Sequence, residues 1–290
     1  MHKNDWSLIF FTLLSQLSVG IILGLTVLNF VSQAAMEHFQ DGAVILSPQF
    51  FALATIVVAT FISFLHLGYP GHAFNAANNL ASSWLSREII GIGLFGFGVL
   101  LIFLQFCLGW ESALFQNFVF GFGAISGLIL IYSMARIYMV NTIPTWNTWF
   151  TPFHFFMSAL VLGLMVVLGF LVSEPASIPV SVILLRIAAA LLLIQLLAAF
   201  LYKHQLIKME HKGISPPDFV SGSYHNLYLI RLFIIFISAL FTAYLSLKLP
   251  SIEVIFTPLI RLYTIVFLLI VVEEIIGRFM FYAGYYRVGV

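Results

Sequence analysis

The chain has 290 residues, of which 62% are hydrophobic and only 8% charged, whereas about 25% are charged in soluble domains. A soluble protein of this length does not bury that much apolar surface, so the composition indicates an integral membrane protein. The net charge of +1 gives no sign of nucleic-acid binding. The single cysteine, Cys107, excludes an internal disulfide and an iron–sulfur cluster held by this chain alone, which needs about four ligands.

Apolar runs in chain order predict eight membrane-spanning helices, since a helix needs about 20 residues to cross the hydrocarbon core. The first run is longer than the core of a signal peptide, so we interpret it as a retained helix. We predict an all-α membrane protein, a single polytopic domain over residues 1–290 that is compatible with two four-helix halves. The predicted helices are Trp6–Val31, Phe50–Leu67, Ile89–Leu108, Phe115–Tyr138, Pro152–Val172, Val180–Tyr202, Leu227–Leu247 and Ile255–Tyr282.

An even number of spans places both termini on one membrane face, together with the connections near residues 68–87, 139–151 and 203–226. Most lysines and arginines of the chain lie nearest this terminal face. The positive-inside rule alone would make that face cytoplasmic.

The prolines fall in predicted loops or first helical turns and at no helix midpoint. Many transporters build their binding sites from helices that are broken near the bilayer centre. The unbroken helices therefore count against a polytopic transporter. The ten prolines are Pro48, Pro70, Pro144, Pro152, Pro175, Pro179, Pro216, Pro217, Pro250 and Pro258.

The most polar interruption runs over residues 65–88, between the second and third predicted helices. His66 ends the second helix, and Glu88 opens the third, about one turn after a predicted cap at Ser83 or Ser86. If the connection folds His66 toward Glu88, the pair is suited to accept two protons from a hydroquinone as its electrons leave. The alternative is that both residues merely solvate helix ends at the membrane boundary.

Arg136 ends the fourth predicted helix, ahead of an aromatic connection that contains Trp146. Aromatic residues gather at membrane interfaces in general, so this pattern alone carries little functional information. The functional alternative is that Arg136 points inward, as a hydrogen-bond donor or as a partner of Glu88.

Three charged residues, Glu273, Glu274 and Arg278, lie in the last predicted helix. An isolated charge costs roughly 2.5–3.5 kcal/mol on insertion, so inward pairing is expected. Glu274 and Arg278 have the i, i+4 spacing of a structural ion pair, although two adjacent acids could also serve a proton path. Gln16 and Gln195, inside other predicted helices, are typical of interhelical hydrogen bonds.

A haem held by two histidines has to be considered, because His66 and His154 lie near the same face on different helices. Both flank loops, whereas haem ligands in such bundles face inward well within the apolar span. We therefore expect no haem and no metal in this chain.

Three stretches of this chain resemble the membrane anchor subunit of bacterial dimethyl sulfoxide reductase, in the same order and with the same number of spans. The most specific is the His-Leu-Gly-x-Pro motif that begins at His66, with Ala-Phe-Asn at residues 73–75. The others are Arg-Ile-Tyr at 136–138 with Thr-Ile-Pro-Thr-Trp at 142–146, and Glu-Ile-Ile-Gly-Arg at 274–278.

The resemblance implies a menaquinol-oxidising anchor for anaerobic respiration in the bacterial inner membrane, whose partners are a ferredoxin-like iron–sulfur subunit and a molybdopterin catalytic subunit. Menaquinol would be its substrate, and the 4Fe-4S clusters would lie in the partners. The resemblance ties His66 and Glu88 to menaquinol binding, and we assign Tyr69 and Arg136 to the same site. The residues assigned to partner docking or loop shaping are Gly68, Pro70, His72, Asn75, Asn78 and Trp146. A purely structural anchor without a quinol site is the alternative.

Two features depart from the family or conflict with it. His72 stands where the family pattern has an arginine, which would weaken a contact to a partner or quinol at high pH. Twin-arginine export signals on related catalytic subunits imply a periplasmic docking face, against the cytoplasmic face that the positive-inside rule indicates. Basic loops kept for docking an acidic partner would mislead that rule.

Overall fold

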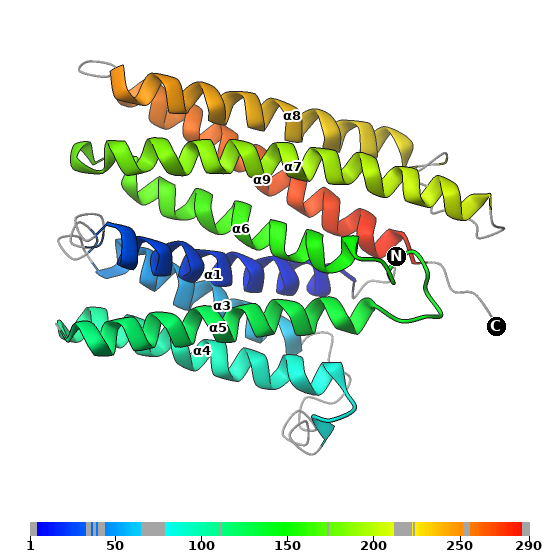
Figure 1. Cartoon of the computed structure of the whole chain (residues 1–290), viewed down its shortest axis with the longest axis horizontal. Coiled ribbons are helices and arrows are strands. Elements are labelled where there is room, and N and C mark those ends of the chain that lie inside the picture. The colour runs from blue at the N-terminus through cyan, green and yellow to red at the C-terminus, as the bar shows by residue number, and fades with distance from the viewer. Residues whose placement is uncertain are drawn as a thin grey trace.

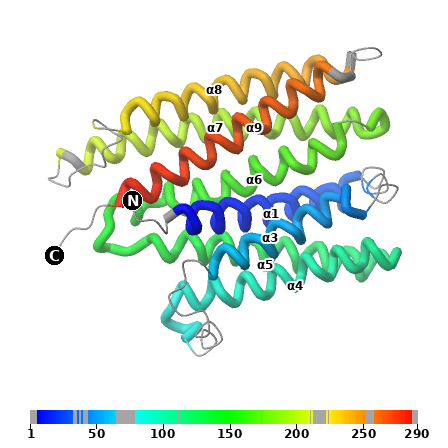
Figure 2. Tube along the Cα trace, turned by 180° about the vertical axis from the view of Figure 1, so that it is seen from behind, coloured from blue at the N-terminus to red at the C-terminus, as the bar shows by residue number. Residues whose placement is uncertain are grey.

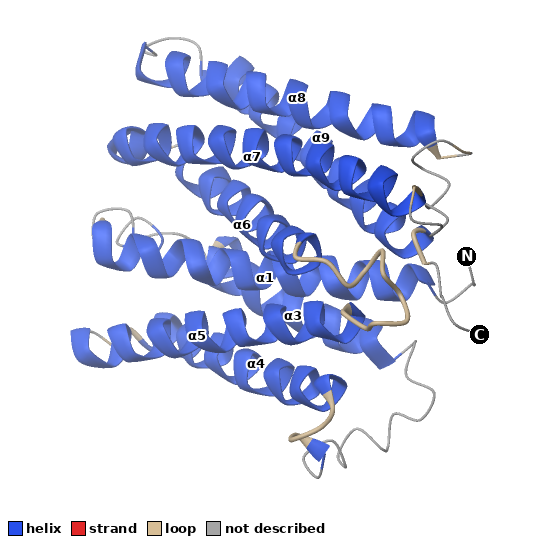
Figure 3. Ribbon diagram, turned by 45° about the vertical axis from the view of Figure 1, so that its right-hand side comes forward, coloured by secondary structure: helices blue, strands red, loops and turns tan. Residues whose placement is uncertain are grey.

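The computed structural model describes residues 5–32, 36, 39, 44–64, 79–110, 112–172, 174–211, 222, 224–251 and 256–285. These residues form helices and their connections, with no strand among them (Figure 3). The α-helices are α1 (Asp5–Val31), α3 (Pro48–Phe64), α4 (Trp84–Leu108), α5 (Ala113–Tyr138), α6 (Phe150–Leu171), α7 (Ile178–Glu210), α8 (His225–Lys248) and α9 (Phe256–Ala283). Short 3₁₀ turns lie at Val44–Leu46, Pro175–Ser177 and Leu249–Ser251.

Six helices of the described chain are long and apolar enough to cross a membrane: α1, α4, α5, α6, α7 and α8. Helix α3 has 17 residues, below the usual length of a span. Helix α9 has 28 residues, but its sequence includes four charged side chains. The chain is therefore an all-α membrane protein, and the count of eight spans stays a prediction.

Local signals account for several helix ends. The hydroxyl of Ser83 caps α4 by accepting a hydrogen bond from the backbone N–H of Ser86 at 3.2 Å. Helix α4 therefore begins at Trp84, ahead of the predicted start at Ile89. It ends where Gly109 adopts φ 60°, a left-handed conformation that glycine tolerates. The prolines within the described ranges lie in connections, in 3₁₀ turns or in first helical turns, as predicted.

Contacts divide the helices into two groups of four. Helices α1, α3, α4 and α5 pack around one another, as do α6, α7, α8 and α9. The two groups meet mainly where α1 lies along α6, at the middle of the bundle (Figures 1 and 2). This grouping agrees with the two four-helix halves that the sequence is compatible with.

The α1–α6 contact depends on small residues. Gly20 of α1 lies against the backbone of Ala159 and Gly163 of α6, so closely that a Cβ atom on either glycine would overlap the opposite backbone. Such contacts are typical of helix pairs in membranes, where close backbone approach replaces the hydrophobic effect.

The start of α1, the end of α9 and the 139–149 connection lie at one end of the bundle, which we call the terminal end (Figure 1). Trp146 ties these elements together: its indole N–H donates to the carbonyl of Phe281 at 2.8 Å, and its ring stacks on the Phe281 ring. Thr145 donates to the carbonyl of Gly284 at 2.8 Å. The end of α9 is thereby fixed beside the start of α6.

Candidate functional site

The side chain of Glu88 is buried near the start of α4, with 7% of the residue exposed. Its position follows from the Ser83 cap, which places Glu88 in the second turn of the helix. It lies within electrostatic range of the phenols of Tyr138 on α5 and Tyr282 on α9. The Glu88 side chain is therefore largely shielded from solvent, although it lies close to a helix start.

Arg136, at the end of α5, and Arg87, near the start of α4, both lie over the ring of Trp84. Its guanidinium carbon lies 5.0 Å from the centre of the Trp84 ring, and that of Arg87 lies 4.1 Å from the same ring. Arg87 is tied down, because it donates to the carbonyls of Leu80 and Ala81 at 2.8 and 2.9 Å.

Arg136 keeps a buried Nε that finds no hydrogen-bond partner in the described part of the chain. No ion pair joins Arg136 to Glu88 among the same residues. The guanidinium therefore lies close to the Glu88 helix while one of its donors is still available.

The other residues predicted for this site lie in a segment outside the described residues. These are His66, Gly68, Tyr69, Pro70, His72, Asn75 and Asn78. Their proposed roles, including the approach of His66 to Glu88, stay predictions.

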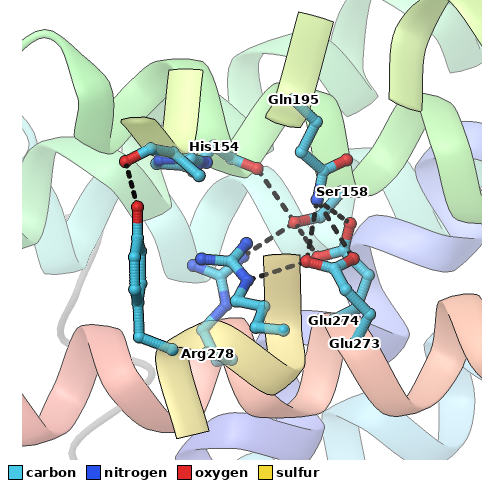
Figure 4. Close-up of polar contacts among 9 residues, drawn as sticks. His154, Ser158, Gln195, Glu273, Glu274 and Arg278 are labelled. Atoms are coloured by element: carbon cyan, nitrogen blue, oxygen red, sulfur yellow. Dashed lines mark hydrogen bonds and ion pairs between the residues drawn. The ribbon is translucent and has the colours of Figure 1, made fainter. Parts of the chain in front are cut away.

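A second polar cluster crosses α6, α7, α8 and α9 (Figure 4). Arg231 Nε donates to Glu273 Oε1 at 2.8 Å, and this is the ion pair that the described residues show in the cluster. Gly277 makes room for it, since a Cβ there would lie 2.6 Å from an Arg231 nitrogen. The Gln195 amide donates to Glu274 at 2.9 Å and to both Glu273 oxygens at 3.1 and 3.2 Å.

Glu274 and Arg278, predicted as an i, i+4 ion pair, are joined through a hydroxyl. Ser158 donates to Glu274 Oε2 at 2.6 Å and accepts from Arg278 Nη2 at 3.3 Å (Figure 4). The same Nη2 donates to Gln16 Oε1 at 2.8 Å. The two amides, Gln16 and Gln195, thus make the kind of interhelical hydrogen bond that the sequence indicates.

A small cleft beside this cluster, with a volume of about 40 Å³, is partly open to the outside. His154, Tyr202 and Tyr228 line it, together with Arg231, Glu274 and Arg278 of the cluster. The His154 ring packs against aromatic rings, edge to face with Tyr202 at a centroid distance of 6.1 Å. In the described part of the chain, no group of three histidine, cysteine or acidic side chains is arranged to hold a metal ion.

A family model matches residues 1–284 of this chain, and its description is the DMSO reductase anchor subunit (DmsC). The chain belongs to the DmsC family. It is 26% identical to one of the chains of the anaerobic dimethyl sulfoxide reductase of Escherichia coli, over 99% of this chain and 96% of that protein.

Other relatives align over part of their length. The YnfH chain of an Escherichia coli anaerobic dimethyl sulfoxide reductase is 29% identical over 55% of each chain. A sulfite dehydrogenase subunit from Allochromatium vinosum is 29% identical over 57% of this chain and 54% of that protein. The chain thus aligns with about half the length of these two relatives. The resemblance to an anchor subunit of dimethyl sulfoxide reductase, predicted from the sequence patterns, is therefore confirmed.

Sequence reasoning missed Arg231 and Ser158, which join the two acids of α9 to neighbouring helices. Arg231 is a charge inside an apolar helix, and that signal could have marked it, because such charges pair inside membrane bundles. Ser158 carries no comparable signal, since serine is common at helix contacts in membranes.

Proposed function

We propose that this chain is the quinol-oxidising membrane anchor of a respiratory molybdoenzyme, embedded in a bacterial inner membrane by eight spans. Its partners are a ferredoxin-like iron–sulfur subunit and a molybdopterin catalytic subunit. The observation that carries the proposal is the burial of the Glu88 side chain near the start of α4, in a chain of the DmsC family. A buried carboxylate in a membrane bundle is expensive and by default functional.

In this proposal, Glu88 and His66 accept the two protons of menaquinol, and Arg136 and Tyr69 hold its oxygens. Oxidation converts the quinol to the quinone with loss of two protons and two electrons. The electrons pass to an iron–sulfur cluster of the partner subunit. The buried Arg136 Nε supports this assignment, because it offers a donor to a ligand oxygen in a setting where hydrogen bonds are strong.

The adjacent position of the ends of α1 and α9 supports a topology with both termini on one membrane face (Figure 1). The partner subunits dock on this terminal end, through the 65–88 and 139–149 segments. A label on an engineered cysteine near each terminus, added from one side of sealed vesicles, tests both the shared face and its orientation.

The similarity to a sulfite dehydrogenase subunit favours a second candidate for the direction of electron flow. In that case the same site would reduce a quinone with electrons from the partner subunits. Quinol oxidation and quinone reduction by the purified complex, measured side by side, separate the two directions.

The test of the site uses Glu88→Gln and His66→Ala in the assembled complex. Each is expected to abolish oxidation of a quinol analogue while the partner subunits still co-purify. Glu174→Gln and His204→Ala are matched controls, because Glu174 precedes α7 at the far end of the bundle and His204 is exposed. Normal turnover in both site variants would remove the assignment, and no saturable quinol binding by the wild type would leave a purely structural anchor.

A further inference from the structure

Protons that leave a quinol at Glu88 enter a side chain that is almost closed to solvent, so they need a route onward. The first members of such a route are two phenols. The hydroxyls of Tyr138 and Tyr282 lie 3.0 Å apart, and both residues are more than nine-tenths buried. Glu88 lies within electrostatic range of both. The phenol pair therefore connects the end of α5 with the end of α9.

Arg278 lies one turn before Tyr282 along α9. Arg278 lies within electrostatic range of Tyr282 and Tyr138. It donates to the Ser158 hydroxyl, whose single hydrogen has two acceptors within reach, Glu274 Oε2 at 2.6 Å and the His154 carbonyl at 2.9 Å. Arginine does not release its own proton in proteins. Arg278 therefore orients the groups around it, and the hydroxyls, carboxylates and water are the groups able to carry a proton.

Three deeply buried atoms in this region have no hydrogen-bond partner within the described ranges: Arg278 Nε, Gln16 Nε2 and Gln195 Oε1. Their residues are at most 4% exposed. Buried polar atoms of this kind are ordinarily satisfied by protein or by ordered water. Two donors and one acceptor along the same path fit water molecules that bridge the gaps between the side chains.

The path ends at two carboxylates, Glu273 and Glu274, and Glu274 lines a cleft. Gln195 donates to both Glu273 and Glu274, so the two carboxylates lie around one amide (Figure 4). Ser158 and Glu274 also line the cleft of His154 and Tyr202, which is partly open to the outside. A proton that reaches Glu274 is therefore at the wall of this cleft.

We propose that the hydrogen-bonded phenols of Tyr138 and Tyr282 and the hydrogen-bonded pair of Ser158 and Glu274, linked by bridging water, form a proton relay from Glu88 to the cleft between α6, α7, α8 and α9. Each transfer breaks an O–H bond on the donor and forms one on the next oxygen. The proton comes from the quinol, and the two electrons leave separately to the partner's iron–sulfur cluster. The relay rests on the proposed quinol oxidation and adds to it the exit of the protons.

The test compares Ser158→Ala and Tyr282→Phe with matched controls in the purified complex. Ser126→Ala removes a buried hydroxyl that bonds only to carbonyls of its own helix, Phe122 and Gly123, in the described chain. Tyr263→Phe removes a buried phenol that donates to the Met165 carbonyl, away from the path. Single-turnover oxidation of a quinol analogue is measured in H₂O and in D₂O, and the affinity for the analogue is measured at equilibrium.

Both relay variants are expected to slow oxidation on the order of 100-fold and to raise the solvent isotope effect, with affinity unchanged. The controls should keep the wild-type rate and isotope effect. Ser158→Thr, which keeps the hydroxyl, should restore the rate and covers the case in which Ser158→Ala does not fold. Tyr138→Phe interrupts the same phenol pair from the other side and covers the case in which Tyr282→Phe does not fold.

Wild-type rates and isotope effects in both relay variants would overturn the relay and leave the quinol site standing. A loss of affinity equal to the loss of rate would also overturn it, because the residues would then hold the quinol. A wild-type complex that does not oxidise the quinol analogue would overturn the relay together with the proposed function.

Discussion

Gly20 and Gly163 place α1 and α6 backbone against backbone, at the seam between the two four-helix groups. No other residue type leaves room for this approach, because a Cβ on either glycine would enter the opposite main chain. The seam also sets where the polar groups of α6 and α1 meet those of α9. Ser158 is near Gly163 on α6, and Gln16 is near Gly20 on α1. Both side chains accept a hydrogen bond from Arg278.

Gly163→Ala is therefore expected to separate α1 from α6 and to destabilise the fold by about 1–3 kcal/mol, the usual cost of overpacking. Thermal unfolding of the detergent-solubilised protein measures the change. Gly93→Ala is the matched control, since a Cβ at Gly93 would meet no atom within 4 Å. Alanine at position 93 should leave the melting temperature unchanged or raise it slightly, because alanine favours helix. Equal melting temperatures for both variants would show that the close contact is not needed.

The sequence predicted the helical elements and several of their ends from local signals. The lengths of the apolar runs predicted the helices. The start of α4 at Trp84, earlier than predicted, is explained by Ser83, which the sequence already offered as a capping residue. Helix α7 continues to Glu210, past the predicted end at Tyr202, because polar residues can extend a helix beyond the apolar run that marks it.

The contacts between helices could not be predicted in the same way. The rotation of each helix decides which partner a charge finds, and periodicity alone does not fix it across helices that are far apart in sequence. Arg231 and Glu273 pair over 42 positions, whereas the i, i+4 spacing drew attention to Glu274 and Arg278. The prediction that Glu88 takes part in quinol binding still depends on His66, which lies outside the described residues.

The ion pair between Arg231 and Glu273 gives a second stability prediction. Arg231→Met should cost roughly 3–5 kcal/mol, because it leaves the Glu273 carboxylate buried without its cationic partner. The double variant Arg231→Met with Glu273→Gln should recover part of that loss, since the remaining amide carries no charge. Chemical or thermal unfolding of the solubilised protein measures both variants.

Arg186→Met is the control for this pair, because Arg186 is exposed on α7 and its removal leaves no buried charge without a partner. It should change stability by less than about 0.5 kcal/mol. If the double variant proves no more stable than Arg231→Met alone, the cost lies in lost packing around Gly277 and not in the uncompensated carboxylate.

The buried Nε of Arg136 leads to the last prediction, which concerns affinity. Arg136→Met keeps most of the side chain that packs near Trp84 but removes every donor of the guanidinium. If Arg136 holds a quinol oxygen, this change should weaken binding of a quinol analogue by roughly tenfold, the loss expected from a hydrogen bond to a charged group. Fluorescence titration of the analogue against the purified complex measures it. Arg261→Met, at an exposed position of α9, should bind as the wild type does. Unchanged affinity in Arg136→Met would mean that this arginine supports the start of α4 and takes no part in holding the quinol.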